Sequence, residues 1–374
     1  MKKIERNSNH ELMRIISMFL IVLGHSILFG NALKNSQNES VTMILMIWEF
    51  ILLVHVNSFA LLTGYYQSNS TFKQSALWKI INQTLFYKAL ILIILTALGL
   101  ISLGKVEILK ELFPINMTQY WFIKVYFLLY CLSPFLNKFI NVLNKKDFKR
   151  LLIVGFILFS IIPAITNYGA FSNNGYTLYN FIYLYFVGAY LRIYPLDKSY
   201  LFKRLSKNAY QLSLIVIFIT SVALRFILYY FADRIAGTNS ILDEIAITIT
   251  HGMDHYSRPL LMIQSIAYFS WFTSITIKSK IINKISPLVL GVYIIHINMY
   301  LREFLFKWVG VDRGPTYSYR LLIDVLLGTI IIFIACLVIE YIRQVIFKFI
   351  YKRKISKKIR DSYYNLLHNI YIKD

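Results

Sequence analysis

Hydrophobic residues occur along this chain in ten runs of about 20 residues, the length that an α-helix needs to cross a bilayer. More polar segments separate the runs. The runs are 11–31, 41–64, 79–102, 119–137, 150–168, 177–193, 209–231, 257–277, 285–307 and 320–343. We therefore predict an all-α fold, a polytopic membrane helix bundle with about ten transmembrane helices.

Positive charges are distributed unevenly between the two sets of connecting segments. If the N-terminus is cytoplasmic, the cytoplasmic side carries roughly four times as many Lys and Arg residues as the opposite side. The sequence therefore predicts that both termini are cytoplasmic (N-in and C-in), which requires an even number of spans. The net charge of +22 then comes from loops that lie against an anionic leaflet. Because the pattern contains no soluble basic domain, it argues against a nucleic-acid partner.

The runs follow one another without a long soluble insertion or a convincing internal repeat of the kind that marks many transporters. We predict one membrane domain over residues 1–350 and a basic cytoplasmic tail over residues 351–374. Both cysteines, Cys131 and Cys336, fall inside hydrophobic runs, which argues against a disulfide or metal framework.

Two ionisable residues of the first run, Arg14 and His25, share one helix face. Their separation of eleven residues corresponds to about 1100°, or three turns plus roughly 20°, and to a rise of about 16 Å. Arg14 is therefore expected near a membrane surface and His25 well inside the membrane. Ionisable groups inside a span are costly, so the pair indicates a function. The alternative is that Arg14 reaches the interface and His25 bonds a neighbouring helix.

Glu49 and His296 are expected at about the depth of His25. Glu49 lies in the second run, and His296 lies about 16 Å from the cytoplasmic end of the ninth. A carboxylate opposite an imidazole would fix its tautomer and raise its basicity, as a general base requires. A polar bond between helices without a catalytic role is the alternative for Glu49. The sequence thus predicts a polar cluster of His25, Glu49 and His296 inside an apolar bundle.

Other polar residues give weaker signals. Arg258 and Arg302 lie in or near the outer halves of their runs and are candidates for contact with an anionic or sugar substrate, whereas Trp121 also fits an aromatic belt. His251 and His255 have a metal-ligand spacing, but they lie in an outer loop without further ligands. We therefore expect no bound metal.

Five short segments together resemble the acyltransferase family 3 membrane proteins of bacteria. The first is the Arg-x10-His of the first run, and the second, 59–65, resembles the family's Phe-x-x-x-Ser-Gly-Tyr element with Thr63 in place of Ser. The segment 120–134 resembles its Trp-to-Pro fourth span, 186–190 its Phe-x-Gly feature, and 286–296 its Tyr-Leu-Ile-His signature. They occur in the order found in the family.

The resemblance implies transfer of an acyl group, usually acetyl, from cytoplasmic acetyl-CoA to a sugar hydroxyl of a surface polysaccharide or lipid-linked saccharide, by a multi-pass enzyme of a bacterial cell membrane. His25 would deprotonate the hydroxyl or carry the acyl group, with help from Glu49, Tyr293 and His296. The implied contacts to acetyl-CoA are Arg14, Thr63, Tyr65 and Lys73. Lys73 is included because the arginines that many members carry after the Gly-Tyr pair are missing here. Trp121, Arg258 and Arg302 are the implied contacts to the acceptor.

Two other functions fit a chain of this size and hydrophobicity. A transporter or flippase of glycans or lipids would also have about ten spans with charges inside the membrane, and its activity would not depend on acetyl-CoA. A glycan polymerase would be expected to have a large outer loop rich in Arg and His, and the loop 232–256 holds a single Arg. The acceptor, the acyl group and the oligomeric state, with a homodimer as one alternative, stay open.

Overall fold

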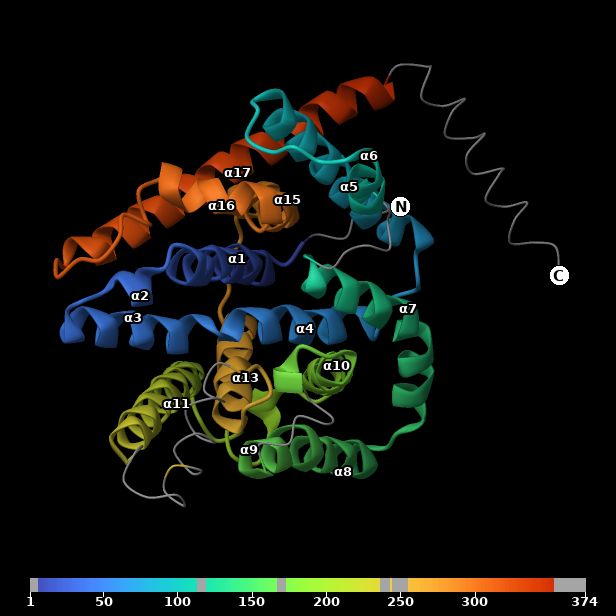
Figure 1. The fold of residues 1–374 in the computed structure, drawn as a ribbon. Coiled ribbons are helices and arrows are strands. Elements are labelled where there is room, and N and C mark those ends of the chain that lie inside the picture. The colour runs from blue at the N-terminus through green and yellow to red at the C-terminus, as the bar shows by residue number, and fades with distance from the viewer. Residues whose placement is uncertain (1–5, 113–118, 167–172, 236–242, 244–254, 353–374) are drawn as a thin grey trace.

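The computed structural model describes residues 6–112, 119–166, 173–235, 243 and 255–352 of the 374-residue chain. Helices dominate these residues, and none of them belongs to a β-strand (Figure 1). The all-α prediction is therefore confirmed. The predicted tail lies almost entirely outside the described residues.

The helices follow the hydrophobic runs closely. They are α1 (Ser8–Phe29), α2 (Ala32–Asn35), α3 (Glu39–Leu52), α4 (Val54–Gln67), α5 (Gln74–Ala97), α6 (Lys105–Leu112), α7 (Trp121–Val142), α8 (Lys145–Phe156), α9 (Ile162–Thr166), α10 (Leu178–Ile193), α11 (Lys207–Ile235), α13 (Pro259–Ser274), α14 (Lys280–Ile285), α15 (Val289–His296), α16 (Met299–Trp308) and α17 (Arg320–Lys352). A π-helical segment, Ile157–Ile161, joins α8 to α9.

Helices occur at all ten predicted spans, but they are unequal in length. Among the described residues, seven helices are long and apolar enough to cross a membrane, or eight if one bent pair counts as a span. The remaining two, α10 and α13, have 16 residues each and are shorter than a full span. The chain is an all-α polytopic membrane protein.

The ninth predicted span is not one helix, so the prediction of an unbroken run over 285–307 is wrong. The helix ends at His296, and α16 leaves it at an angle of 95°. Asn298 begins α16, because its side-chain oxygen accepts hydrogen bonds from the amides of Tyr300 and Leu301 at 3.1 and 3.2 Å. Residue 296 therefore lies at a helix end.

The second predicted span is interrupted at Leu53, between α3 and α4. The carbonyl oxygen of Phe50 accepts hydrogen bonds from the buried side chains of Arg225 and Gln264, at 2.9 Å each. These donors come from α11 and α13 and take the place of a helical amide at the break. The arrangement keeps Glu49 and His55, which flank the break, on the same cavity wall.

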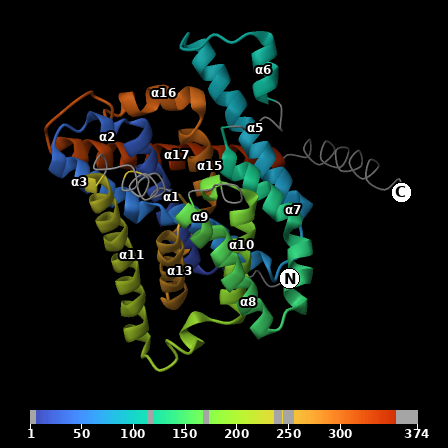
Figure 2. The same cartoon turned by 60° about the horizontal axis from the view of Figure 1, so that its bottom comes forward.

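Helix α1 lies in the middle of the bundle. It packs against α14, α15 and α17 on one side and against α3, α4 and α13 on the other (Figure 1). The two largest clusters of buried apolar residues both include side chains from α1. A view turned by 60° shows α11 beside α13 (Figure 2), and in Figure 1 both lie on the other side of α3 and α4 from α17. The Arg14 and His25 side chains therefore start from a helix that has neighbours on both sides.

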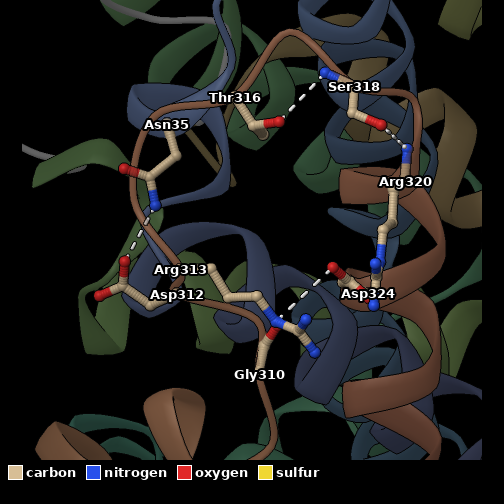
Figure 3. A network of polar contacts seen from close by, with 8 residues as sticks. All are labelled: Asn35, Gly310, Asp312, Arg313, Thr316, Ser318, Arg320 and Asp324. Atoms are coloured by element: carbon tan, nitrogen blue, oxygen red, sulfur yellow. Dashed lines mark hydrogen bonds and ion pairs between the residues drawn. The ribbon is translucent and has the colours of Figure 1, made fainter.

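The loop between α16 and α17 is held by polar contacts to the end of α2, the short helix that follows α1 (Figure 3). The Asp312 carboxylate accepts a hydrogen bond from Asn35 at 2.9 Å, and backbone bonds of 2.8 and 2.9 Å join Thr316 to Asn35 and Gln37. Arg313 approaches Asp324 of α17 at 3.8 Å. These contacts hold the loop that follows α16 against α2, which follows the end of α1 that carries His25.

Helices α4 and α10 approach each other at two glycines from the quoted motifs. A Cβ at Gly188 would overlap with the carbonyl oxygen of Leu61, and one at Gly64 would overlap with that of Tyr185. Small residues at such contacts let helix backbones pack closely in a membrane. This contact gives the Thr-Gly-Tyr and Phe-x-Gly segments a shared structural role.

We expect Gly188→Ala to lower the free energy of unfolding by about 1–3 kcal/mol, because the added methyl group forces the two backbones apart. Thermal unfolding of the detergent-solubilised protein measures the effect. Gly104→Ala is the matched control, since the nearest atom to its Cβ is a Glu107 side-chain oxygen at 3.7 Å. Equal melting temperatures for the two variants would show that the close approach is not needed.

Candidate active site

Arg14 and His25 line two separate cavities, at different levels along α1. The one lined by His25, here the His25 cavity, has a volume of about 590 Å³. The one lined by Arg14, here the Arg14 cavity, has a volume of about 370 Å³. The predicted separation along an unbroken helix is confirmed, because α1 runs from Ser8 to Phe29 without interruption.

The two cavities share one wall, which consists of Ile21, Phe122 and Tyr293. The rings of Phe122 and Tyr293 meet edge to face, with centroids 5.9 Å apart. The Tyr293 hydroxyl is buried and, within the described residues, makes no hydrogen bond of normal geometry. The wall therefore brings an unpaired donor to the point where the two cavities meet.

His25 and His296 form a hydrogen-bonded pair beside this wall. The Nδ1 atom of His25 lies 2.8 Å from the Nε2 atom of His296. The Nδ1 atom of His296 lies 2.6 Å from the carbonyl oxygen of Val292. His296 is fully buried, whereas His25 is half-buried and lines the cavity.

The hydrogen-bond chain assigns a tautomer to each ring of the neutral pair. A carbonyl oxygen only accepts, so Nδ1 of His296 carries a proton and its Nε2 holds a lone pair. That lone pair accepts the Nδ1 proton of His25. The Nε2 atom of His25 is then unprotonated and available to the cavity. His296 thus orients His25 in the way that an orienting group positions a general base.

Glu49 lines the His25 cavity, but the partner of His25 Nδ1 is an imidazole and not this carboxylate. The predicted arrangement of Glu49 opposite His25 as its orienting group is therefore corrected. His55, which the sequence reasoning did not select, lines the same cavity, and within the described residues its buried Nδ1 atom has no hydrogen-bond partner. An ionisable residue inside a predicted span is the sequence signal that could have identified His55.

Aromatic rings, Gln119 and one arginine also line the His25 cavity. Trp121 contacts Tyr176 and Tyr256, with ring centroids 4.6 and 6.0 Å away. Arg302 lies over the ring of Phe29, with its guanidinium carbon 4.4 Å from the centroid. Two of the three predicted acceptor contacts, Trp121 and Arg302, are therefore in one cavity with His25.

Arg14 is the one charged residue among the described residues that line its cavity. Its guanidinium donates to a Glu11 oxygen at 2.7 Å, and the second oxygen of Glu11 accepts a hydrogen bond from Ser286. Guanidinium has five N–H donors, so this bond orients Arg14 and leaves further donors for an anion. Thr63 lines the same cavity, and its hydroxyl donates to the Phe59 carbonyl at 2.7 Å.

Tyr66, and not the predicted Tyr65, faces the Arg14 cavity. Its hydroxyl lies 2.6 Å from His10 Nδ1, and the other nitrogen of His10 lies 3.1 Å from the Thr273 hydroxyl. The Arg192 guanidinium, which the sequence reasoning also missed, lies 5.3 Å from the ring of Tyr65 and 5.9 Å from that of Tyr66. Its place at the end of a predicted span gave only the signal of an interfacial cation.

Three residues of the sequence analysis lie elsewhere. Lys73 is exposed at the start of α5, where its backbone amide donates to the Tyr130 hydroxyl, and it does not line the Arg14 cavity. Arg258 donates to the carbonyl oxygen of Ala164 at 2.8 Å and does not line the His25 cavity. His251 lies outside the described residues, and those residues contain no cluster of three metal-ligating side chains.

Comparisons with known proteins agree with the resemblance drawn from the motifs. No curated protein and no solved structure matches this chain. The model of acyltransferase family 3, described as an acyltransferase domain, matches residues 7–342 and covers nearly the whole chain. The match includes every residue that lines the two cavities. The chain belongs to the acyltransferase 3 family and is a membrane acyltransferase.

Proposed function

We propose that this acyltransferase moves an acetyl group from acetyl-CoA to a sugar hydroxyl of a surface polysaccharide or lipid-linked saccharide in a bacterial cell membrane. The observation that carries the proposal is the shared wall between the Arg14 and His25 cavities, with the histidine pair beside it. Two substrates held in the two cavities would meet at this wall.

The Arg14 cavity suits the donor. A guanidinium binds phosphate through several parallel hydrogen bonds, so Arg14 would hold a phosphate of CoA near the end of α1. The remaining lining is mostly apolar or neutral, with Met18, Phe59 and Leu290 among its residues. The uncharged pantetheine arm would follow it, which would place the thioester at the shared wall.

The His25 cavity suits a saccharide acceptor. Trp121 and Tyr256 offer flat, amphipathic rings to a sugar ring. Arg302 and Glu49 line the same cavity and would supply polar groups that fix the orientation of the sugar.

The reaction needs one proton transfer before the acyl transfer and one after it. The Nε2 atom of His25 takes the proton from the sugar hydroxyl, and the resulting oxygen attacks the thioester carbonyl. The Tyr293 hydroxyl donates a hydrogen bond to the oxyanion that forms. Collapse breaks the carbon–sulfur bond, and the CoA thiolate takes the proton from His25. Transfer through an acyl group on His25 uses the same residues.

The test is acetyl transfer in membranes that contain the protein, with acetyl-CoA labelled in the acetyl group and a panel of surface and lipid-linked glycans as acceptors. We expect label in glycan that depends on the protein and is released by mild base, as an O-ester is. Membranes without the protein and acetyl-CoA labelled in the nucleotide are the controls. Glycan movement across the membrane without acetyl-CoA, and with no labelled product, would support a transporter instead.

A further inference from the structure

A third cavity lies at the ends of α10, α11 and α13, on the side that the charge pattern predicts to be cytoplasmic. It has a volume of about 650 Å³, and we call it the lysine cavity because Lys198, Lys203 and Lys207 line it. All three belong to the loop between α10 and α11 or to the first turn of α11. Asp197 is the one acidic residue in its described lining. Neither the proposed donor site nor the acceptor site includes these residues.

The lining opposite the lysines is rich in hydroxyl groups. Ser270, Thr273 and Ser274 of α13 and the buried Tyr210 of α11 line the same cavity. The Thr273 and Ser274 hydroxyls donate to the carbonyl oxygens of Phe269 and Trp271, at 3.0 and 2.7 Å, and their oxygens make the cavity polar. The lysine ammonium groups are compact positive charges with three N–H donors each, which they can direct at an anion. This combination of groups fits a phosphate anion.

The loop beside the cavity also carries exposed apolar side chains. Tyr200 is 84% exposed and Leu201 is 77% exposed, and Leu205 is exposed as well. Side chains of this kind next to basic residues are typical of a segment that lies in the headgroup region of a bilayer. We therefore expect that the phosphate bound here belongs to a lipid, whose acyl chains contact the exposed apolar residues.

We propose that the lysine cavity binds the phosphate headgroup of an anionic phospholipid from the cytoplasmic leaflet. Basic pockets between transmembrane helices on that side of a membrane bind such headgroups. The three lysines attract the negative charge and donate hydrogen bonds to the phosphate oxygens, and Tyr200 and Leu201 lie among the acyl chains. The site takes one lipid, since the three lysines surround a single cavity.

The test uses the full-length protein in detergent and native mass spectrometry, with dioleoylphosphatidylglycerol and dioleoylphosphatidylcholine as probes. We expect the first phosphatidylglycerol to bind at least tenfold more tightly than phosphatidylcholine. In the triple variant Lys198→Gln, Lys203→Gln and Lys207→Gln, its affinity is expected to fall about 100-fold, at about fivefold for each lysine. The matched control, Lys138→Gln, Lys146→Gln and Lys149→Gln, removes three exposed lysines of α7 and α8 that line none of the three cavities. It is expected to keep the wild-type affinity.

Three results would overturn the proposal. Equal losses in the two triple variants would mean that lipid binds to a diffuse positive surface. Equal affinity for the two lipids would remove the role of the anionic phosphate. Displacement of phosphatidylglycerol by inorganic phosphate or by CoA would assign the cavity to a soluble phosphate. If the triple variant unfolds, the single change Lys203→Glu at an exposed position tests the same electrostatic effect, and an unchanged affinity in it counts against the site.

Discussion

Replacing His25 by Asn is expected to lower kcat for acyl transfer about 1000-fold without unfolding the protein. Proton transfer by a positioned side chain contributes about 100- to 10,000-fold to catalysis. The Asn side-chain amide takes the place of the Nδ1 donor, so the hydrogen bond to His296 can be kept while the basic Nε2 atom is lost. The measurement is the rate of label transfer from acetyl-CoA to glycan, at saturating concentrations of both substrates.

Thermal unfolding separates loss of the base from loss of the fold in this variant. His25→Asn is expected to melt within a few degrees of the wild type, whereas His25→Ala also removes the contact with buried His296 and is expected to be less stable. A kcat within threefold of the wild type in His25→Asn would rule out proton abstraction by His25. In that case the hydrogen-bonded pair would have only a structural role.

Replacing Arg14 by Ala is expected to lower kcat/KM for acetyl-CoA about 10- to 100-fold, mainly through a higher KM. Hydrogen bonds between charged groups contribute about 1.5–3 kcal/mol each, and the variant loses at least one such bond to a CoA phosphate. The KM for the glycan is expected to stay nearly constant, because Arg14 does not line the His25 cavity. Steady-state kinetics with each substrate varied in turn measures both constants.

The control for Arg14 is Arg150→Ala. Arg150 makes the same kind of ion pair, with the Asp147 carboxylate three residues earlier at 3.3 Å, but it is exposed and lines neither cavity. Its removal is expected to leave both KM values unchanged. Arg14→Lys keeps the charge but not the several parallel donors, so an intermediate KM is expected. An unchanged KM for acetyl-CoA in Arg14→Ala would place the CoA phosphates elsewhere.

Much of this arrangement can be predicted from sequence because helix geometry is regular. The distance of about 16 Å between Arg14 and His25 follows from their spacing alone. The same rise, counted from the start of the ninth run, put His296 at the depth of His25, and the two imidazoles form a hydrogen bond. A buried helix of uniform pitch preserves such depths, so residues on different spans can be matched before their contacts are known.

Contacts between helices decide what spacing alone leaves open. Neighbouring residues on a helix differ by about 100° in direction, so a Gly-Tyr-Tyr sequence does not tell which tyrosine faces the Arg14 cavity. The packing of Gly64 on α10 turns Tyr66 toward it. The break after His296 lies inside a run that is apolar enough to continue, and the new helix α16 starts there with Asn298 as its N-cap. Arg258 was predicted to contact the acceptor, but it binds the carbonyl of Ala164 instead. That carbonyl is far from Arg258 in the sequence, so spacing could not indicate the contact.

The wall of Ile21, Phe122 and Tyr293 has a consequence for the membrane as well as for the reaction. Its residues face both cavities, so the layer between them is a single side chain thick. With the orientation that the positive charges predict, we expect Arg14 nearer the cytoplasmic side of the bilayer and His25 nearer the outer side. In the proposed reaction, an acetyl group would pass across this layer while CoA and glycan each stay in their own cavity. The same three side chains would then separate the contents of the two cavities during the transfer.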